Sequence, residues 1–386
     1  MRALEFYSGI GGLHLALVRS HVSAEVVRAF DWDQNACEVY SANFGQGIAQ
    51  KVLFTASFLF SRPLSEVQTD ISTLTAQYVA TLDASLWLLS PACQPYTVLN
   101  PSAKGDKDPR AKSFLYLIQT VLPELVSMEK HPTHFLVENV AGFEASIGST
   151  TRQILTSTLQ SLGYYIAEFL LTPLQFGIPN SRLRYYLLAK RSPFAQPGDP
   201  HPLSPLRHIP GAGCEDWVDT RDEPSATAAA HQDVTEIREY LDPDPASEED
   251  YSIPEKVLRK WGRLFDIVLP SARRSCCFTR GYTQLVECAG SIVQLNEDED
   301  TTSVFDAFLD AQTTSRPEDA VRILDCLRLR YFTPDELLRI FAFNPLRTPQ
   351  TFTWPPSVSR KVKYRLIGNS VNVRVVTELI RYLFRE

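Results

Sequence analysis

The sequence lacks the features that would place a protein in or across a membrane. Among its 386 residues, no apolar run approaches the roughly 18–20 residues that a membrane-spanning helix needs. Residues 1–6 lead straight into a strand-like segment, without the charged, apolar and small-residue regions of a secretory signal. We therefore expect a protein that stays inside the cell, in the cytoplasm, the nucleus or both.

Cysteine pairs of the kind that bind metals are also missing. The chain has seven cysteines, an odd number, and no two of them have the C-x-x-C spacing of a zinc ribbon or a redox motif. Cys276 and Cys277 are adjacent, which favours two buried thiols. We expect no metal site.

Positive charge is in deficit overall but not everywhere. The net charge is −7, which taken alone argues against a nucleic-acid partner. Residues 191–250 hold 14 acids and 4 bases, and residues 296–320 hold 8 acids and 1 base, so the rest of the chain carries +10. Residues 251–295 contain 7 Lys or Arg against 3 acids. The body of the protein is therefore basic, as a polyanion-binding protein requires.

The two acidic segments look like insertions. Residues 191–250 contain nine of the 26 prolines as well as the acids, which predicts a largely flexible linker. Residues 296–320 predict a solvated loop. No internal repeat is present.

The first 190 residues alternate between strand-like and helix-like stretches. Apolar runs predict strands at 3–7, 25–30, 86–89, 135–137 and 185–189, and helical spacing predicts helices at 13–18, 114–126 and 151–162. Gly163 follows the last of these helices as a C-terminal cap. This β-α rhythm favours a parallel sheet covered by helices. A final helix is predicted over 369–384, with an Asn/Ser start and one apolar face.

A glycine turn separates the first strand from the first helix. Gly9, Gly11 and Gly12 would let the main chain approach a ligand closely. Asp31 follows the next strand, 22 residues after Gly9, a spacing that suits a carboxylate binding both ribose hydroxyls of a nucleoside. Because His14 stands where G-x-G-x-x-G has its third glycine, a dinucleotide site is disfavoured. An ordinary strand–helix turn with a loop aspartate is the alternative.

Further reactive groups flank other predicted strands. Cys93 lies on a proline-bracketed loop after the strand at 86–89, and a neighbouring cation or helix N-terminus would make its thiol nucleophilic. Glu138 follows the strand at 135–137 and could donate a proton to a base ring. Arg182 and Arg184 precede the strand at 185–189 and can bind a carbonyl oxygen or a phosphate. Singly, these residues also fit a structural cysteine, a capping acid and two solvated arginines. Together they predict one site, because ligands of such sheets bind at the strand ends.

Six ordered motifs connect the sequence with a known family. The chain resembles the cytosine-C5 methyltransferases across nearly its whole length. The motifs are Phe6–Gly12, Asp31-Trp32 with Asp70-Ile71, Pro91–Gln94, Glu138–Val140, Arg182 with Arg184, and Gly368–Ser370. The resemblance implies an α/β fold, a Rossmann-like methyltransferase sheet with a smaller target-recognition domain, and S-adenosyl-L-methionine as the cofactor.

The resemblance also assigns roles to individual residues. It implies four catalytic residues, Cys93, Glu138, Arg182 and Arg184. It implies cofactor contacts from Tyr7, Gly9, Gly11, Gly12, Asp31, Trp32, Asp70, Ile71, Ser90, Asn369 and Ser370. It implies substrate contacts from Gln94, Asn139, Val140, Cys277, Phe278, Thr279 and Arg280.

Two segments are most similar to the type-2 branch, the tRNA-Asp cytosine-38 methyltransferases. Cys277–Tyr282 resembles the Cys-Phe-Thr signature of that branch, and Phe176–Arg182 resembles its arginine motif. The resemblance implies methylation of cytosine C5 in tRNA through a covalent bond between Cys93 and C6. Phosphate contacts would come from Arg259, Lys260, Arg263, Arg273, Arg274 and Arg280, for which an ordinary solvated face is the alternative.

One departure from the family concerns the nucleophile loop. The family usually has proline before the cysteine, and this chain has Ala92. Proline fixes φ near −65°, so we expect a looser loop here.

The implied organisation has four parts. A catalytic, cofactor-binding part at 1–190 is followed by the acidic linker at 191–250, a target-recognition domain at 251–328 with its acidic loop at 296–320, and C-terminal motifs at 329–386 that return to the catalytic domain. We expect a monomer. The alternatives are a DNA cytosine-C5 methyltransferase and a weakly active or inactive nucleic-acid-binding homologue.

Overall fold

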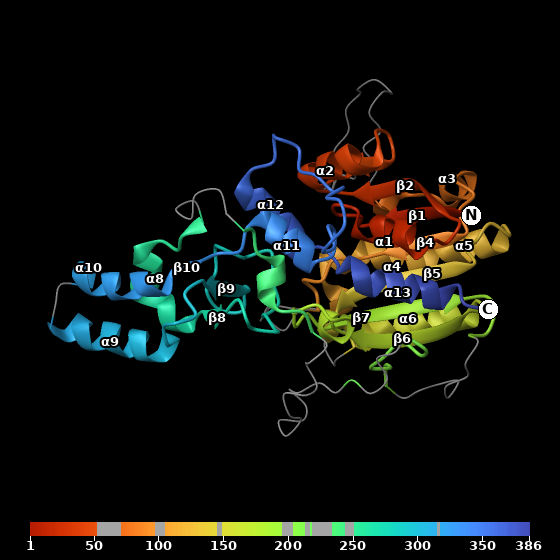
Figure 1. The fold of residues 1–386 in the computed structure, drawn as a ribbon. Helices are drawn as coiled ribbons and strands as arrows, with labels where there is room; N and C mark the ends of the chain where they lie inside the picture. Colours follow the sequence, from red (N-terminus) through yellow and green to blue (C-terminus); the bar gives the residue numbers. More distant parts are fainter. Residues whose placement is uncertain are drawn as a thin grey trace.

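Two lobes make up the structure, a larger one around a seven-stranded sheet and a smaller one around a three-stranded sheet (Figure 1). The computed structural model describes residues 1–51, 71–96, 105–144, 149–194, 204–212, 217, 234–243, 251–314 and 317–386. None of the described helices has both the length and the apolar character to cross a membrane.

The large sheet is mainly parallel, as predicted, but one strand makes it a mixed sheet. Its strand order is β3-β2-β1-β4-β5-β7-β6, and β7 runs antiparallel to both of its neighbours. No crossover helix separates β6 from β7, so the chain turns back on itself instead of crossing the sheet. The strands are β1 Arg2–Phe6, β2 Glu25–Asp31, β3 Ala49–Lys51, β4 Leu86–Leu89, β5 His134–Val140, β6 Tyr165–Leu171 and β7 Arg184–Lys190.

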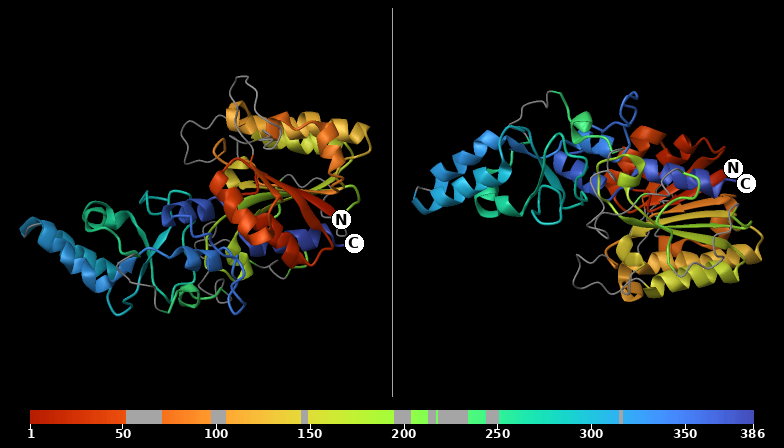
Figure 2. Two further views of the ribbon diagram at one scale, coloured as in Figure 1. Left: turned by 90° about the horizontal axis from the view of Figure 1, so that it is seen from above. Right: turned by 60° about the horizontal axis from the view of Figure 1, so that its bottom comes forward.

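Helices cover both faces of this sheet (Figure 2). One face carries α1 Gly12–Ser20, α2 Gln34–Phe44 and α13 Val373–Leu383, and the other carries α3 Ala76–Thr81, α4 Lys112–Tyr116, α5 Leu122–Ser127 and α6 Ser149–Ser161. Alternation along the strands feeds both cores: in β1, Ala3 packs on the first side and Leu4 on the second. The predicted strands and the predicted helices at 114–126 and 151–162 are confirmed.

The last helix begins later than predicted. The side chain of Asn372 caps α13 by accepting hydrogen bonds from the backbone of Arg374 and Val375. Asn369 instead ends the preceding helix, α12 Arg360–Gly368. The predicted start at Asn369 is therefore wrong, because two helices meet where the sequence pattern suggested one.

The smaller lobe contains a helix that the sequence analysis missed. Its strands are β8 Asp266–Val268, β9 Ser291–Gln294 and β10 Leu329–Arg330, and its helices are α8 Glu255–Trp261, α9 Thr301–Thr314 and α10 Pro317–Ala320. The prediction of a solvated loop at 296–320 is wrong, because α9 buries Phe305 and Phe308 while Asp306 stays exposed. An acidic segment can be helical when its few apolar residues fall on one face.

Part of the predicted flexible linker is packed. Ile209, Val234, Ile237 and Tyr240 are all buried in the core that runs between the lobes. For 204–212 and 234–243 the prediction of a flexible linker is therefore wrong. Residues 195–203, 213–216, 218–233 and 244–250 of the predicted linker lie outside the described residues.

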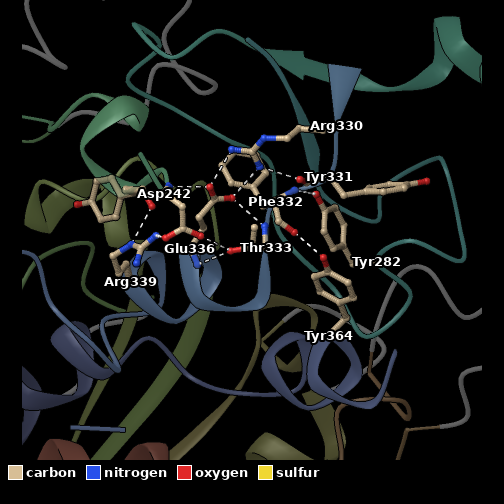
Figure 3. Close-up of polar contacts among 10 residues, drawn as sticks. Asp242, Tyr282, Arg330, Tyr331, Phe332, Thr333, Glu336, Arg339 and Tyr364 are labelled. Atoms are coloured by element: carbon tan, nitrogen blue, oxygen red, sulfur yellow. Dashed lines mark hydrogen bonds and ion pairs between the residues drawn. The ribbon is translucent and has the colours of Figure 1, made fainter. Parts of the chain in front are cut away.

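A buried polar network joins the smaller lobe to α11 Pro334–Ile340 and to α12 (Figure 3). Arg330 of β10 forms an ion pair with Glu336 of α11, with both side chains almost fully buried. The backbone of Phe332 links two tyrosines to the network. Its N–H donates a hydrogen bond to Tyr282 Oη at 2.9 Å, and its carbonyl accepts one from Tyr364 Oη at 2.6 Å. The network fixes how the C-terminal segment leaves the smaller lobe and returns to the large sheet.

Candidate active site

The predicted glycine turn joins β1 to α1. Gly9 and Gly11 have φ values of +53° and +86°, which glycine adopts without strain. A Cβ at Gly11 would lie 2.2 Å from the Phe44 ring, and a Cβ at Gly12 would lie 2.7 Å from the side chain of Val371. Gly12 therefore packs against the residue that follows Ser370, which brings the first predicted motif to the last.

Asp31 holds this turn in place. Its Oδ2 accepts a hydrogen bond from Gly9 N at 2.7 Å, and its Oδ1 accepts one from Asp33 N at 2.8 Å. Burial raises the pKa of Asp31 to about 6. The next residue, Trp32, is 59% exposed. The turn thus pairs a shielded carboxyl group with an open aromatic face.

Other residues predicted to contact the cofactor are spread around this turn. Tyr7 Oη lies 2.9 Å from Ser113 Oγ, and Ile71 is buried in the core on the α4 side. Asp70 lies outside the described residues. Ser370 Oγ donates to Leu366 O at 2.8 Å, so it fastens the loop between α12 and α13.

The predicted nucleophile loop follows β4. Cys93 is half-buried, as is its neighbour Gln94, and Asn139 Nδ2 anchors the loop by donating to Pro91 O at 3.1 Å. Burial raises the pKa of the Cys93 thiol, although the guanidinium of Arg184 opposes this. A further cation beside the sulfur would lower this pKa again.

Glu138 lies between two partners in β5, just before Val140 ends the strand. Ser90 Oγ donates to Glu138 Oε2 at 2.6 Å, and Arg184 Nε lies 3.6 Å from Glu138 Oε1. The glutamate and arginine side chains are only 9% and 14% exposed. Because both groups shift the pKa of Cys93, acid, cation and thiol lie in one electrostatic environment.

Arg182 differs from Arg184 in what it binds. Its side chain is buried, and it donates to Phe278 O at 2.7 Å, to Ser370 O at 2.7 Å and to Gly368 O at 3.1 Å. These carbonyls belong to the Cys-Phe-Thr loop and to the C-terminal motif. The contacts of Arg182 make it a positioning residue that holds three distant segments together.

The Cys-Phe-Thr loop reaches the site through Cys277. Its Sγ lies 3.4 Å from Arg182 Nη1 and 3.5 Å from Arg184 Nη2. Burial raises the pKa of the Cys277 thiol, but the two guanidiniums outweigh it and the net pKa is lowered. A Cβ at Gly368 would lie 2.2 Å from the Thr279 carbonyl carbon, so this loop packs directly on the C-terminal motif.

Phe278 does not offer its side chain to a substrate. Its ring is fully buried and packs edge-on against Tyr282 and Phe332, with centroids 5.2 and 5.3 Å away. The ring fills the core of the smaller lobe, so the predicted substrate contact of Phe278 would have to come from its backbone. The neighbouring Arg280 is exposed. Among the described residues, no group of three or more His, Cys, Asp or Glu side chains could hold a metal ion.

Comparison with known proteins now identifies the family. A profile described as C-5 cytosine-specific DNA methylase matches residues 1–385. The chain belongs to this family of C-5 cytosine-specific methylases.

Full-length relatives and solved structures agree with this assignment. The chain is 37% identical to a tRNA (cytosine(38)-C(5))-methyltransferase of Schizosaccharomyces pombe, over 99% of this chain and 96% of the relative. It is 33% identical to a DNA (cytosine-5)-methyltransferase of Dictyostelium discoideum, over 99% and 94% of the two chains. A crystal structure of a Spodoptera frugiperda DNMT2 mutant superposes with a TM-score of 0.75 at 33% identity, covering 100% and 99% of the two chains.

One feature of this methylase was missed from the sequence. Glu5 of β1 is fully buried beneath the glycine turn, where it accepts a hydrogen bond from Tyr40 Oη at 2.8 Å. Tyr40 Oη in turn lies 2.7 Å from His14 Nδ1. An acid at the centre of an otherwise apolar strand was the signal that could have revealed this network.

Proposed function

We propose that this protein is an S-adenosyl-L-methionine-dependent methyltransferase that modifies C5 of a cytosine in tRNA. Its target would be position 38 in the anticodon loop of tRNA-Asp, reached in the cytoplasm or the nucleus. The grouping of Glu138, Arg184 and Cys93 carries the proposal, because it combines an acid, a cation and a nucleophile at one edge of the sheet. The full-length relative named as a tRNA (cytosine(38)-C(5))-methyltransferase supports RNA as the substrate.

The glycine turn and its neighbours fit the cofactor. A Cβ at Gly9 would meet no atom within 4 Å, so space is open on that side of the turn. The Asp31 carboxylate suits the ribose hydroxyls, and the exposed ring of Trp32 offers a face to the adenine. When bound, S-adenosyl-L-methionine supplies a methyl group on a positively charged sulfonium. A positive charge near Cys93 would lower the pKa of its thiol.

The chain's own residues would then activate the base. The Cys93 sulfur forms a bond to C6 of cytosine, and the electrons of the C5–C6 double bond make C5 enamine-like. Glu138 donates a proton or hydrogen bond to N3, and Arg184 binds O2, which offsets the charge that develops in the ring. After C5 has gained the methyl group, loss of its proton expels the Cys93 sulfur and restores the aromatic ring.

Methyl transfer to a defined tRNA tests the proposal. Purified protein and radiolabelled S-adenosyl-L-methionine are incubated with tRNA-Asp carrying either cytosine or another base at position 38. We expect label only with cytosine, and none with Cys93→Ala. Cys326→Ala removes an exposed cysteine and is the matched control that should keep full activity. Equal labelling of the two tRNAs, or full activity of Cys93→Ala, would refute the proposal.

DNA cytosine methylation is the second candidate. The Dictyostelium relative named as a DNA (cytosine-5)-methyltransferase favours it. The same active site would serve, but a base in duplex DNA must first be unstacked and unpaired, whereas an anticodon-loop base is already unpaired. Side-by-side rates on tRNA-Asp and on duplex DNA decide between the two substrates.

A further inference from the structure

The six basic residues predicted to contact phosphates differ in whether they already form ion pairs. Arg273 and Arg274 are already engaged, because they form ion pairs with Glu236 and Asp266 at 2.9 Å each. Four others are exposed and form no ion pair with any described residue, and three of these lie in or directly after α8: Arg259, Lys260 and Arg263, with Arg280 as the fourth. Free cations for a polyanion are therefore concentrated at α8.

An exposed tryptophan lies within this basic segment. Trp261 ends α8 and is 43% exposed, and no residue of α8 is buried. The Lys260 ammonium lies 4.7 Å from the centroid of the Trp261 ring. Burying apolar surface contributes about 25 cal/mol of stabilisation per Å², and the exposed part of the Trp261 ring lacks this stabilisation until a partner covers it. A ring held beside free cations in this way is suited to a partner that is both aromatic and anionic.

We propose that Trp261 is a stacking platform for an unpaired base of the RNA substrate, with Lys260 and Arg263 contacting the phosphates on either side. An unpaired nucleotide presents the required combination, a flat base for the indole and a phosphate for the ammonium or guanidinium. The inference rests on the proposed RNA substrate and adds a second contact to it.

The position of α8 separates this contact from the target cytosine. Figure 1 shows α8 in the smaller lobe next to α10, away from the large sheet, and Cys93 follows strand β4 of that sheet. A base on Trp261 is therefore a different nucleotide from the one that enters the active site. The platform would act on RNA affinity and leave the chemical step unchanged.

Steady-state kinetics on tRNA-Asp test the platform. Stacking on one aromatic side chain corresponds to roughly 5- to 150-fold in affinity, so we expect Trp261→Ala to raise the KM for tRNA within that range. The kcat and the KM for S-adenosyl-L-methionine should not change. Trp261→Phe keeps a ring and should stay within about threefold of the wild type. Tyr165→Ala, which removes an exposed aromatic from the larger lobe, is the matched control.

Three results would contradict the stacking role of Trp261. An unchanged KM in Trp261→Ala, the same change in Tyr165→Ala, or a Trp261→Phe variant as weak as Trp261→Ala would overturn the platform. If the wild type methylates no tRNA, the proposed function fails, and filter binding of the same variants to tRNA still tests the platform. In that assay Lys260→Gln should also lower the slope of log affinity against log salt by about one unit.

Discussion

Removal of the Glu336 carboxylate tests how the two lobes are joined. This carboxylate accepts hydrogen bonds from Arg330 Nη1 and Nη2 at 2.9 and 2.8 Å, and from the backbone N–H groups of Thr333 and Asp242 at 2.8 and 2.9 Å. The Arg330 side chain is 3% exposed, so Glu336→Ala leaves a buried cation without its partner. Breaking a buried ion pair in this way costs about 3–5 kcal/mol.

The same loss can be expressed as a melting temperature. For 386 residues, the entropy of unfolding is about 0.8 kcal/mol/K, so we expect Glu336→Ala to lower Tm by roughly 5 °C. Urea unfolding and thermal melting followed by circular dichroism measure both quantities. Replacing both partners, as in Arg330→Met with Glu336→Leu, should recover most of the loss, because no unpaired charge is left behind.

An exposed ion pair provides the control for this experiment. Arg322 and Glu255 form a pair at 2.8 Å with side chains 66% and 55% exposed, and such pairs contribute about 0–1 kcal/mol. Glu255→Ala should therefore be nearly neutral. If the free energies of unfolding of Glu336→Ala and Glu255→Ala differ by less than about 1 kcal/mol, the expected contribution of the buried network is refuted.

Three further predictions concern the catalytic lobe. Gly11→Ala should weaken binding of S-adenosyl-L-methionine in calorimetry by about tenfold or more, because the new Cβ would lie 2.2 Å from the Phe44 ring and φ is +86°; wild-type affinity would contradict this. Burial raises the pKa of Glu5 from 4.5 to about 8, so its contribution to stability is complete below pH 4.5 and is lost as pH rises through 8; Glu5→Gln should flatten urea-unfolding stability over this window, and an unchanged profile would count against a protonated Glu5. Ala92→Pro should stiffen the nucleophile loop and raise the single-turnover rate about two- to fivefold, and a slower variant would show that the loop needs its freedom.

The local features of the large lobe were predictable because their signals are short in sequence. An apolar run of four residues was enough to place β4, and Gly9 through Gly12 were enough to place the turn after β1. Polar residues at the ends of such runs then share one edge of the sheet. Cys93, Glu138 and Arg184 were therefore predicted to lie together, and the 3.6 Å distance from Arg184 Nε to Glu138 Oε1 and the influence of both groups on the pKa of Cys93 agree with this.

The features that the sequence did not reveal depended on contacts between distant parts of the chain. The antiparallel placement of β7 depends on which strands it pairs with, and a strand's own sequence does not encode its neighbours. The α9 helix was hidden because it lies in the segment 296–320, whose 8 acids against 1 base suggested a solvated loop, although α9 itself buries Phe305 and Phe308. The burial of the Phe278 ring was also not predicted, because Phe332, one of the rings that it packs against, lies more than 50 residues later.

Arg182 and Arg184 are close in sequence, but contacts with distant parts of the chain give them different roles. The sequence presents them as an equivalent pair, and both guanidiniums touch Cys277. The Arg182 guanidinium donates hydrogen bonds to carbonyls of the smaller lobe and of the C-terminal motif. Arg184 instead lies beside Glu138, where it could bind a base. Since those carbonyls are supplied almost 100 and 190 residues further along the chain, the site is complete only when the C-terminal segment has returned to the large sheet. The geometry of the catalytic residues therefore depends on the packing of the two lobes against each other. A substitution that weakens this packing should disturb the base-binding residues before it unfolds the large sheet.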